Sequence, residues 1–332
     1  MQEVYKSLSA KVGLPDSTYL PEVWRILLTD EEAKAADALP QSAQDLSQLW
    51  GEPLQRVEPI LNSLFRKGAA FKAKKADQVT YKLAKNIIQL HDACLLWDGA
   101  SQPFFELWKK IMDQEFTAML RNMPEDVQLP SFMRVIPIQQ TLAPKSDVLT
   151  FEECEKMIDE SATIAVVRCP CRLSQQNCDR PIETCIQLNR GAEYVVDRGH
   201  GRQIDKDEAL AILKQAEEAG LVHMSENRSF GNAICNCCSC CCEMFRLMEF
   251  SGKSWILSPS RFLAHVNEAC NACQACLDVC PTQAISLDGQ LAQVSQADCI
   301  GCGLCANACP EDAIVLNPVR PKEHIPDPRP AR

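Results

Sequence analysis

The chain has 332 residues, of which 46% are hydrophobic, and its formal net charge is −10. This length allows two or three domains with a substantial core. The negative charge argues against a protein that coats nucleic acid, and no stretch reaches the ~20 apolar residues that span a bilayer. The 20 cysteines come without a secretion signal, so we expect metal sites in a reducing cytoplasm and not disulfides.

The N-terminal region predicts three helices followed by a hairpin. A capping-box pattern at 29–32 begins the first helix, and Ser42 caps a second. A third helix over 54–67 carries apolar residues at helical spacing, and two strand-like runs follow at 70–74 and 79–83. This order resembles a winged helix–turn–helix domain, so we expect residues 1–86 to form a winged-helix-like domain.

Two interpretations of this domain compete. Basic residues gather around the third helix and the hairpin, opposed locally by Asp77: Arg66, Lys67, Lys72, Lys74, Lys75, Lys82 and Lys85. On the first interpretation the helix enters a major groove of DNA and the hairpin contacts phosphates. On the second, the basic residues form a solvated face or a docking surface for an acidic partner. Because Glu58 would repel phosphate and its neighbours offer little to read base edges, DNA is the less favoured partner.

A connector is expected over residues 87–149. Its first part, 87–122, carries apolar stripes at helical spacing and is predicted to be helical. Its second part contains Pro124, Pro130, Pro137 and Pro144, and is expected to be extended and to wrap the next domain.

Residues 150–260 are expected to form a Cys-rich α/β domain. A capping box at 150–153 begins a helix, and the apolar run 163–167 predicts a buried strand. The strand leads into the spacing C-x-C-x6-C-x6-C, formed by Cys169, Cys171, Cys178 and Cys185. After a helix over 205–220 and a strand at 221–223 come six cysteines within eight residues: Cys235, Cys237, Cys238, Cys240, Cys241 and Cys242.

The most specific pattern lies nearer the C-terminus, where C-x2-C-x2-C-x3-C-P occurs twice. Three cysteines at two-residue intervals let one tight loop offer three soft sulfur ligands to three irons of a cube. In such a run the last cysteine ligates the other cluster. We therefore expect two [4Fe–4S] clusters, with ligands Cys270, Cys273, Cys276 and Cys309 for one and Cys299, Cys302, Cys305 and Cys280 for the other.

Residues 262–317 resemble the bacterial two-cluster ferredoxins. Pro281 and Pro310 follow the fourth cysteines, and each precedes an Ala-Ile pair, 284–285 and 313–314. The resemblance implies a pseudo-symmetric ββ/α domain over 261–317 that holds two clusters and transfers single electrons. Zinc is the disfavoured alternative, because zinc sites usually come as two separated C-x2-C pairs. The proline-rich residues 318–332 are expected to be an extended or disordered tail.

The cysteines of the middle domain leave several arrangements open. Adjacent thiols rarely point the same way, so one cluster cannot use all six cysteines of the run. Either Cys169, Cys171, Cys178 and Cys185 form a closed set and the run, through Cys235, Cys238 and Cys241, supplies another cluster, or the two groups share ligands. We favour one or two further [4Fe–4S] clusters, with zinc as the alternative. The paired pattern resembles Cys-rich, ferredoxin-fused proteins of anaerobes.

These features predict a multidomain α+β iron–sulfur protein that transfers electrons to a redox protein partner. Exposed clusters suggest anaerobic metabolism, because dioxygen attacks them, and acidic residues such as Asp278, Asp298, Glu311 and Asp312 would steer a basic partner. The alternatives are a redox-sensing DNA-binding regulator and a cluster-containing oxidoreductase. No P-loop, dinucleotide fingerprint or nucleophile elbow occurs, so no catalytic residue is assigned, and a carrier or complex subunit is favoured over a stand-alone enzyme.

Overall fold

A computed structural model describes residues 1–75, 78–124, 126–127, 129–144, 148–149, 152–229 and 231–326. Asp77, the first half of the expected capping box at 150–153 and the end of the proline-rich tail, 327–332, lie outside the described residues. The chain divides into two compact units. Unit 1 comprises Met1–Asn122, Pro170–Gln176 and Asp197–His200, and unit 2 comprises Met123–Cys169, Asn177–Val196 and Gly201–Arg332.

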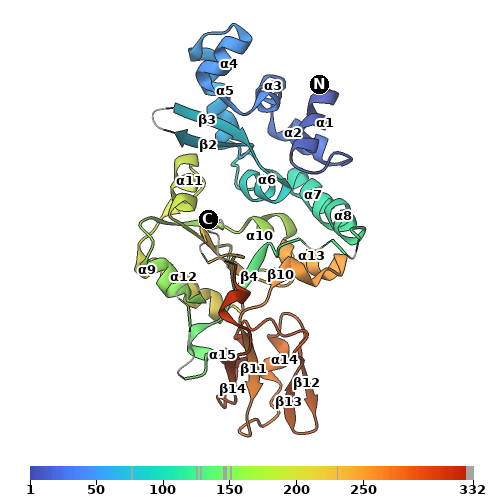
Figure 1. Ribbon diagram of the computed structural model, residues 1–332, viewed down its shortest axis with the longest axis vertical. Coiled ribbons are helices and arrows are strands. Elements are labelled where there is room, and N and C mark those ends of the chain that lie inside the picture. The colour runs from blue at the N-terminus through green and yellow to red at the C-terminus, as the bar shows by residue number, and fades with distance from the viewer. Residues whose placement is uncertain are drawn as a thin grey trace. The chain divides into compact units, whose positions relative to one another are not determined.

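Unit 1 begins with α1 (Gln2–Lys11) and α2 (Leu20–Leu27), which pack against each other. The next elements are α3 (Asp30–Ala38), β1 (Gln41–Ser42), α4 (Ala43–Trp50), α5 (Leu54–Arg66), β2 (Ala70–Lys75) and β3 (Gln78–Leu83). Capping boxes form at Thr29 and Ser42, as the sequence suggests. The strands pair in the order β1-β3-β2. Figure 1 shows β2 and β3 side by side. This order is compatible with the winged-helix interpretation, which stays a prediction.

Two of the clustered basic residues make ion pairs within unit 1. The Lys67 Nζ lies 2.7 Å from the Glu32 carboxylate, and that carboxylate is buried. The Lys72 Nζ lies 3.1 Å from the Asp197 carboxylate and 3.9 Å from the centre of the Phe65 ring. The free positive surface is therefore smaller than the local sequence suggests.

The rest of unit 1 is helical. It contains α6 (Ile87–Cys94), α7 (Gln102–Lys110), the π-helical turn Ile111–Phe116, α8 (Thr117–Arg121) and α10 (Pro170–Gln175). Phe104, Trp108 and Ile111 are fully buried, so the apolar stripe is a packing face. Cys171 and Arg172 lie in α10 and therefore belong to unit 1.

Unit 2 contains one large sheet and the C-terminal cysteine motifs. Among its described residues, seven strands pair in the order β10-β4-β8-β9-β6-β5-β7. Their bounds are β4 (Met133–Ile136), β5 (Ile164–Arg168), β6 (Glu183–Leu188), β7 (Arg202–Gln203), β8 (Val222–Glu226), β9 (Ala233–Cys237) and β10 (Leu257–Ser258). The β10–β4 pair is parallel and the other pairs are antiparallel.

Two helices, α9 (Cys154–Asp159) and α12 (Lys206–Glu218), pack against this sheet and supply its core. The helices α11 (Arg190–Arg198) and α13 (Glu243–Ser251) follow β6 and β9 in the chain. Ile158 of α9 and Ile212 of α12 pack against Ile164, Ile186 and Ile234 of three neighbouring strands. Burial of these branched side chains fixes the central strands, whose ends carry the cysteines of the middle region.

The C-terminal segment forms two small antiparallel sheets with a short helix beside each cysteine loop. β11 (Phe262–Val266) pairs with β14 (Ile314–Pro318), and β12 (Ile285–Asp288) pairs with β13 (Leu291–Val294). The helices α14 (Ala275–Asp278) and α15 (Leu304–Asn307) follow the second cysteine of each triplet (Figure 1). Positive φ angles recur 29 residues apart: Ala272 and Gly301, Gln274 and Gly303, and Gln283 and Asp312. The backbone is thus duplicated, as the resemblance to ferredoxins implies.

The C-terminal segment is fixed to the rest of unit 2 by backbone and charge contacts. The Ile138 N–H donates to the Cys302 carbonyl at 3.0 Å, and the Ala143 N–H donates to the Leu316 carbonyl at 2.8 Å. Arg261 donates two hydrogen bonds, of 2.7 and 2.8 Å, to the Glu152 carboxylate, and both side chains are buried. Among the described residues, no helix is both long and apolar enough to cross a bilayer.

The buried Arg261–Glu152 pair gives a stability prediction. Replacing Glu152 by Ala leaves the guanidinium buried without its carboxylate, so we expect the free energy of unfolding to fall by about 3–5 kcal/mol. The matched control is Arg202→Ala, which removes exposed ion pairs to Glu183 and Glu208 and should cost less than about 1 kcal/mol. Denaturant titration followed by circular dichroism measures both. Equal losses for the two variants would contradict the assignment.

Candidate metal centres

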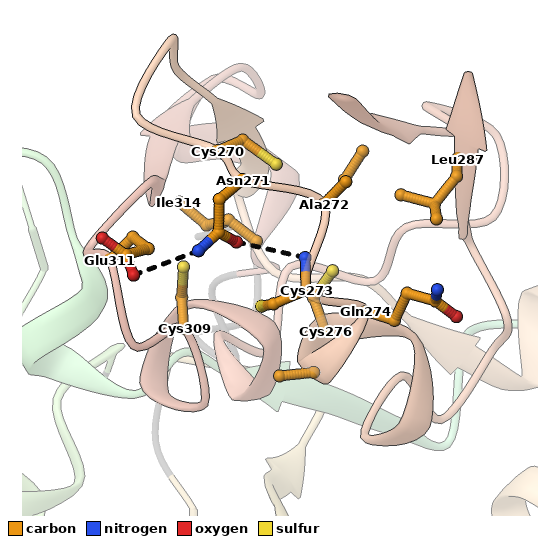
Figure 2. A pocket seen from close by; sticks show the side chains of 12 residues that line it. Cys270, Asn271, Ala272, Cys273, Gln274, Cys276, Leu287, Cys309, Glu311 and Ile314 are labelled. Carbon is orange, nitrogen blue, oxygen red and sulfur yellow. Dashed lines mark hydrogen bonds between the residues drawn. The ribbon is translucent and has the colours of Figure 1, made fainter. Parts of the chain in front are cut away.

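The first cysteine loop surrounds an open hollow of about 320 Å³. Cys270, Cys273, Cys276 and Cys309 line it, and Figure 2 shows their sulfurs turned toward one space. The Asn271 side chain ties the two contributing loops together. Its Nδ2 donates to Glu311 Oε1 at 3.1 Å, and its Oδ1 accepts from the Cys273 N–H at 3.1 Å (Figure 2). Cys276 is buried but Cys273 is exposed, so one side of this hollow faces solvent.

The second cysteine loop surrounds a hollow of nearly the same size, about 330 Å³. Its cysteines are Cys280, Cys299, Cys302 and Cys305, and the last two are buried. Neighbouring segments press on this loop from outside. A Cβ atom on Gly301 would lie 2.2 Å from the Phe262 carbonyl oxygen, and one on Gly303 would lie 2.5 Å from Thr141 Oγ1. Glycine is therefore needed at these two positions for close packing, and it also adopts their left-handed φ without strain.

The donor chemistry of both hollows suits iron–sulfur clusters. Each brings together four soft sulfur ligands. The Ala284 N–H donates to Cys280 Sγ at 3.2 Å, and the equivalent Ala313 N–H donates to Cys309 Sγ at 3.3 Å. Such N–H···S bonds stabilise a thiolate and raise the potential of a bound cluster. Burial raises the pKa of Cys302 to about 12, so its thiolate form needs a bound cation.

The middle region contains a compact group of four cysteines, Cys178, Cys238, Cys240 and Cys241, which we call the Cys178 group. All four sulfur atoms lie within 4.8 Å of one another. The sulfur of Cys178 is 3.8 Å from that of Cys238 and 3.7 Å from that of Cys241, and the sulfurs of Cys240 and Cys241 are 3.8 Å apart. The group packs against Ala216, near the end of α12, and Leu221, which directly precedes β8.

A second set of thiols, which we call the Cys185 group, lies around the ends of β5, β6 and β9. It consists of Cys169, Cys185, Cys235, Cys237 and Cys242. The thiols of Cys169 and Cys235, which hydrogen-bond to Cys185, raise its pKa well above the usual range. In the same way Cys235 and Cys242 raise the pKa of Cys237. These contacts form one continuous chain of five sulfurs.

The alternation of side chains along β9 and the turn after this strand explain which cysteines of the run join the Cys178 group and which join the Cys185 group. Successive side chains of a strand point to opposite faces, so Cys235 and Cys237 share one face. Asn236 points to the other face, where its Nδ2 donates to the Thr184 carbonyl at 2.6 Å. After Cys237 the chain turns, with the Cys242 N–H donating to the Cys238 carbonyl at 3.1 Å. Three cysteines of the run consequently join each group.

The structure groups the middle cysteines differently from the closed set considered in the sequence. Cys178 lies with Cys238 and Cys241, apart from Cys169 and Cys185, which lie with Cys235. The arrangement corresponds to the alternative in which the two sequence groups share ligands. Cys237, Cys240 and Cys242 were not among the candidate ligands, although strand alternation through Cys235 would have pointed to Cys237. All ligand assignments stay predictions.

A wide cleft also lies in unit 2, beside the second cysteine loop. It is lined by α9, α12 and residues 137–140, and Asn307 of α15 reaches it. Inside it the buried His223 ring hydrogen-bonds through Nε2 with Glu217 at 3.1 Å and through Nδ1 with Asn236 at 2.6 Å. The His223 ring and its hydrogen bond lower the pKa of Glu217 against the opposing effect of burial.

Comparison with protein families supports the chemistry of the C-terminal segment. Residues 269–313 match the model of a family described as a 4Fe-4S dicluster domain. No curated protein matches the chain, and no solved structure matches it. The match and the many cysteines support an iron–sulfur electron-transfer protein with [4Fe–4S] clusters in this segment.

The close packing around Gly301 in the second loop gives a prediction for which Gly289 is the control. Gly301 and Gly289 have similar left-handed φ angles, +65° and +63°, but nothing lies within 4 Å of a Cβ on Gly289. Gly301→Ala should open the second loop and lower the iron content by about four atoms per chain, one [4Fe–4S] cluster. Gly289→Ala should retain all its iron. Iron and sulfide assays of anaerobically purified protein test this, and equal iron contents would refute it.

Proposed function

We propose that the protein is an electron carrier or a subunit of a redox complex, and that a basic protein partner docks at the exposed loop around Cys273. A [4Fe–4S] cluster held by each set of four C-terminal cysteines would supply one-electron transfer. The observation that carries the proposal is the difference in exposure between the two sets. Cys273 is exposed, whereas Cys302 and Cys305 are buried.

This difference in solvent exposure implies that the two cysteine loops have different roles in electron transfer. Electron tunnelling falls steeply with distance, so a partner must approach the site with the thinner protein cover. Asn271, Cys273 and Gln274 are all exposed on the first loop. The second loop is covered by Ile138, Thr141 and Phe262 and cannot be approached from that side. The first loop therefore meets the partner, whereas the second is packed on one side against the rest of unit 2.

The charge of the segment indicates the kind of partner. No lysine or arginine occurs between Arg261 and Arg320. The same stretch contains six acidic residues, all exposed: Glu268, Asp278, Asp288, Asp298, Glu311 and Asp312. A surface of one sign attracts partners of the opposite sign and raises their association rate. This supports a partner with a basic docking face.

Charge reversal tests the docking site. Asp278→Lys, two residues beyond Cys276, should slow electron transfer from the reduced protein to a basic cytochrome c by about three- to tenfold at low salt. Glu249→Lys changes the net charge equally, but Glu249 is an exposed residue of α13, outside the C-terminal segment, and its replacement should have little effect. At about 1 M salt the two variants should converge, because the Debye length falls to about 3 Å. Stopped-flow absorbance follows the reaction, and equal slowing by both variants would count against the site.

We further propose that the Cys185 group holds one additional [4Fe–4S] cluster. Five thiols meet at the ends of three neighbouring strands, which exceeds the four ligands that a cube requires. Among the described residues, no three of these sulfurs form a group within 4.8 Å of one another, unlike those of the Cys178 group, and ligands of several irons must be spread in this way. This site would add a third redox centre to unit 2.

Iron content tests this additional centre. The intact protein should contain about 12 irons per chain. Cys235→Ser removes the thiol that links Cys185 to Cys237, so it should lower the iron content to about eight. Cys154→Ser is the matched control, because Cys154 is buried in α9 outside both thiol groups and should be dispensable. Anaerobic reconstitution followed by iron and sulfide analysis gives the numbers. A wild-type value of about eight, unchanged in Cys235→Ser, would exclude the additional cluster.

The regulator and enzyme alternatives have weaker support. The strand order β1-β3-β2 behind α5 favours a winged helix, but Lys67 and Lys72 are paired within unit 1 and present less charge to DNA. The cleft around Glu217 and His223 offers space for a small molecule, yet among the described residues it brings no cysteine group of unit 2 into its lining. Electron transfer is therefore the function that the structure supports best.

A further inference from the structure

The sulfur spacing in the Cys178 group is too short for a cubane cluster and matches a single ion. Four sulfurs at the corners of a tetrahedron, each about 2.3 Å from a central zinc, lie about 3.8 Å from one another. The observed sulfur separations are 3.7 Å for Cys178–Cys241 and 3.8 Å for Cys178–Cys238 and Cys240–Cys241. Ligands of a cube bind four different irons and must stand further apart.

The C-terminal cysteines of the same chain provide an internal comparison. Among the described residues, none of the eight cysteines in that segment belongs to a group whose donor atoms all lie within 4.8 Å. Instead the two sets of four cysteines line two separate hollows. The protein thus contains two kinds of cysteine site, one with its sulfurs spread around a hollow and one with its sulfurs close together.

From this geometry we infer that Cys178, Cys238, Cys240 and Cys241 form a closed, mononuclear zinc site with four thiolate ligands. Zinc is the metal chosen because a d¹⁰ ion accepts tetrahedral sulfur without redox change, and structural zinc sites are four-coordinate with no open position. Binding displaces four thiol protons and leaves a site with a net charge of −2.

The surroundings of the group fit this charge. Arg180 Nη1 points at Cys240 Sγ at 3.8 Å, while its Nε donates to the Ala219 carbonyl at 3.1 Å. The Asn177 Nδ2 donates to the Cys240 carbonyl at 2.8 Å, and Arg246 Nη1 donates to the same oxygen at 3.3 Å. One cation beside the sulfurs offsets part of the negative charge, and the amide and guanidinium groups hold the turn that presents Cys240.

The position of the site indicates its role. Cys178 comes from the segment that follows α10, whereas Cys238, Cys240 and Cys241 come from the turn after β9. The ion would cross-link two segments whose cysteines, Cys178 and Cys238, are 60 residues apart. Both cysteines pack against Ala216 and Leu221. It would also fix the turn whose remaining cysteines, Cys237 and Cys242, belong to the Cys185 group. The inferred zinc is thus structural and stands beyond the proposed electron transfer.

Zinc-edge X-ray absorption of the full chain, purified without oxygen, tests the inference without interference from iron. We expect about one zinc per chain with four sulfur neighbours at about 2.3 Å. Wild-type protein without zinc, or zinc with fewer than four sulfur neighbours, would overturn it. This measurement does not depend on the folding of any variant.

Two substitutions connect the signal to these residues. Cys238→Ser should remove the zinc and leave the iron of the C-terminal segment in place. Cys178→His should keep about one zinc, since zinc also accepts a Cys₃His set, and should replace one sulfur neighbour by nitrogen. The control Cys273→Ser should lose iron and keep zinc. Loss of about four irons with unchanged zinc in Cys238→Ser would place a cubane cluster there and reject the inference.

Discussion

Sulfur held close to sulfur is the constraint on which the architecture of unit 2 depends. Ionised thiols repel one another and lose hydration when buried, so each group needs cations and N–H donors to persist. The fold provides backbone donors at Cys280 and Cys309 and a guanidinium at Cys240. The central sheet places further thiols at the ends of its strands. Metal bound to these groups would offset the repulsion between thiolates and would cross-link the segments that carry them.

Sulfur atoms are spread apart in one kind of cysteine site of unit 2 and lie close together in the other. The two arrangements suit different roles. Cysteines spread around a hollow, such as that at Cys270, would suit an inorganic cube whose charge can change. Four sulfurs close together, such as those at Cys238, would suit a single ion whose charge does not change. Electron transfer is faster when the surroundings of a redox centre reorganise little. A redox-inert cross-link beside the Cys185 group would serve that requirement by holding the turn at Cys242 rigid.

The sequence predicted the C-terminal segment in more detail than the middle region, for a physical reason. Regular spacing around Cys270 and Cys299 confines the sulfurs to tight loops, so spacing alone indicates which residues meet. In the run after Cys235 the grouping depends on where a strand ends and a turn begins, and on Cys178 from a distant segment. The same limit applies to Lys67, whose partner Glu32 lies 35 residues away. The strand β4 was also missed, because flanking prolines suggested an extended connector.

The two halves of the duplicated C-terminal backbone accept different side chains at equivalent positions. Left-handed positions in the first half carry Ala272 and Gln274, while the matching positions in the second carry Gly301 and Gly303 against tightly packed neighbours. Substitutions should therefore be tolerated better around the first centre than around the second. Descendants of such a duplication would be expected to diversify in the partners they recognise and to preserve the inner half as a common anchor.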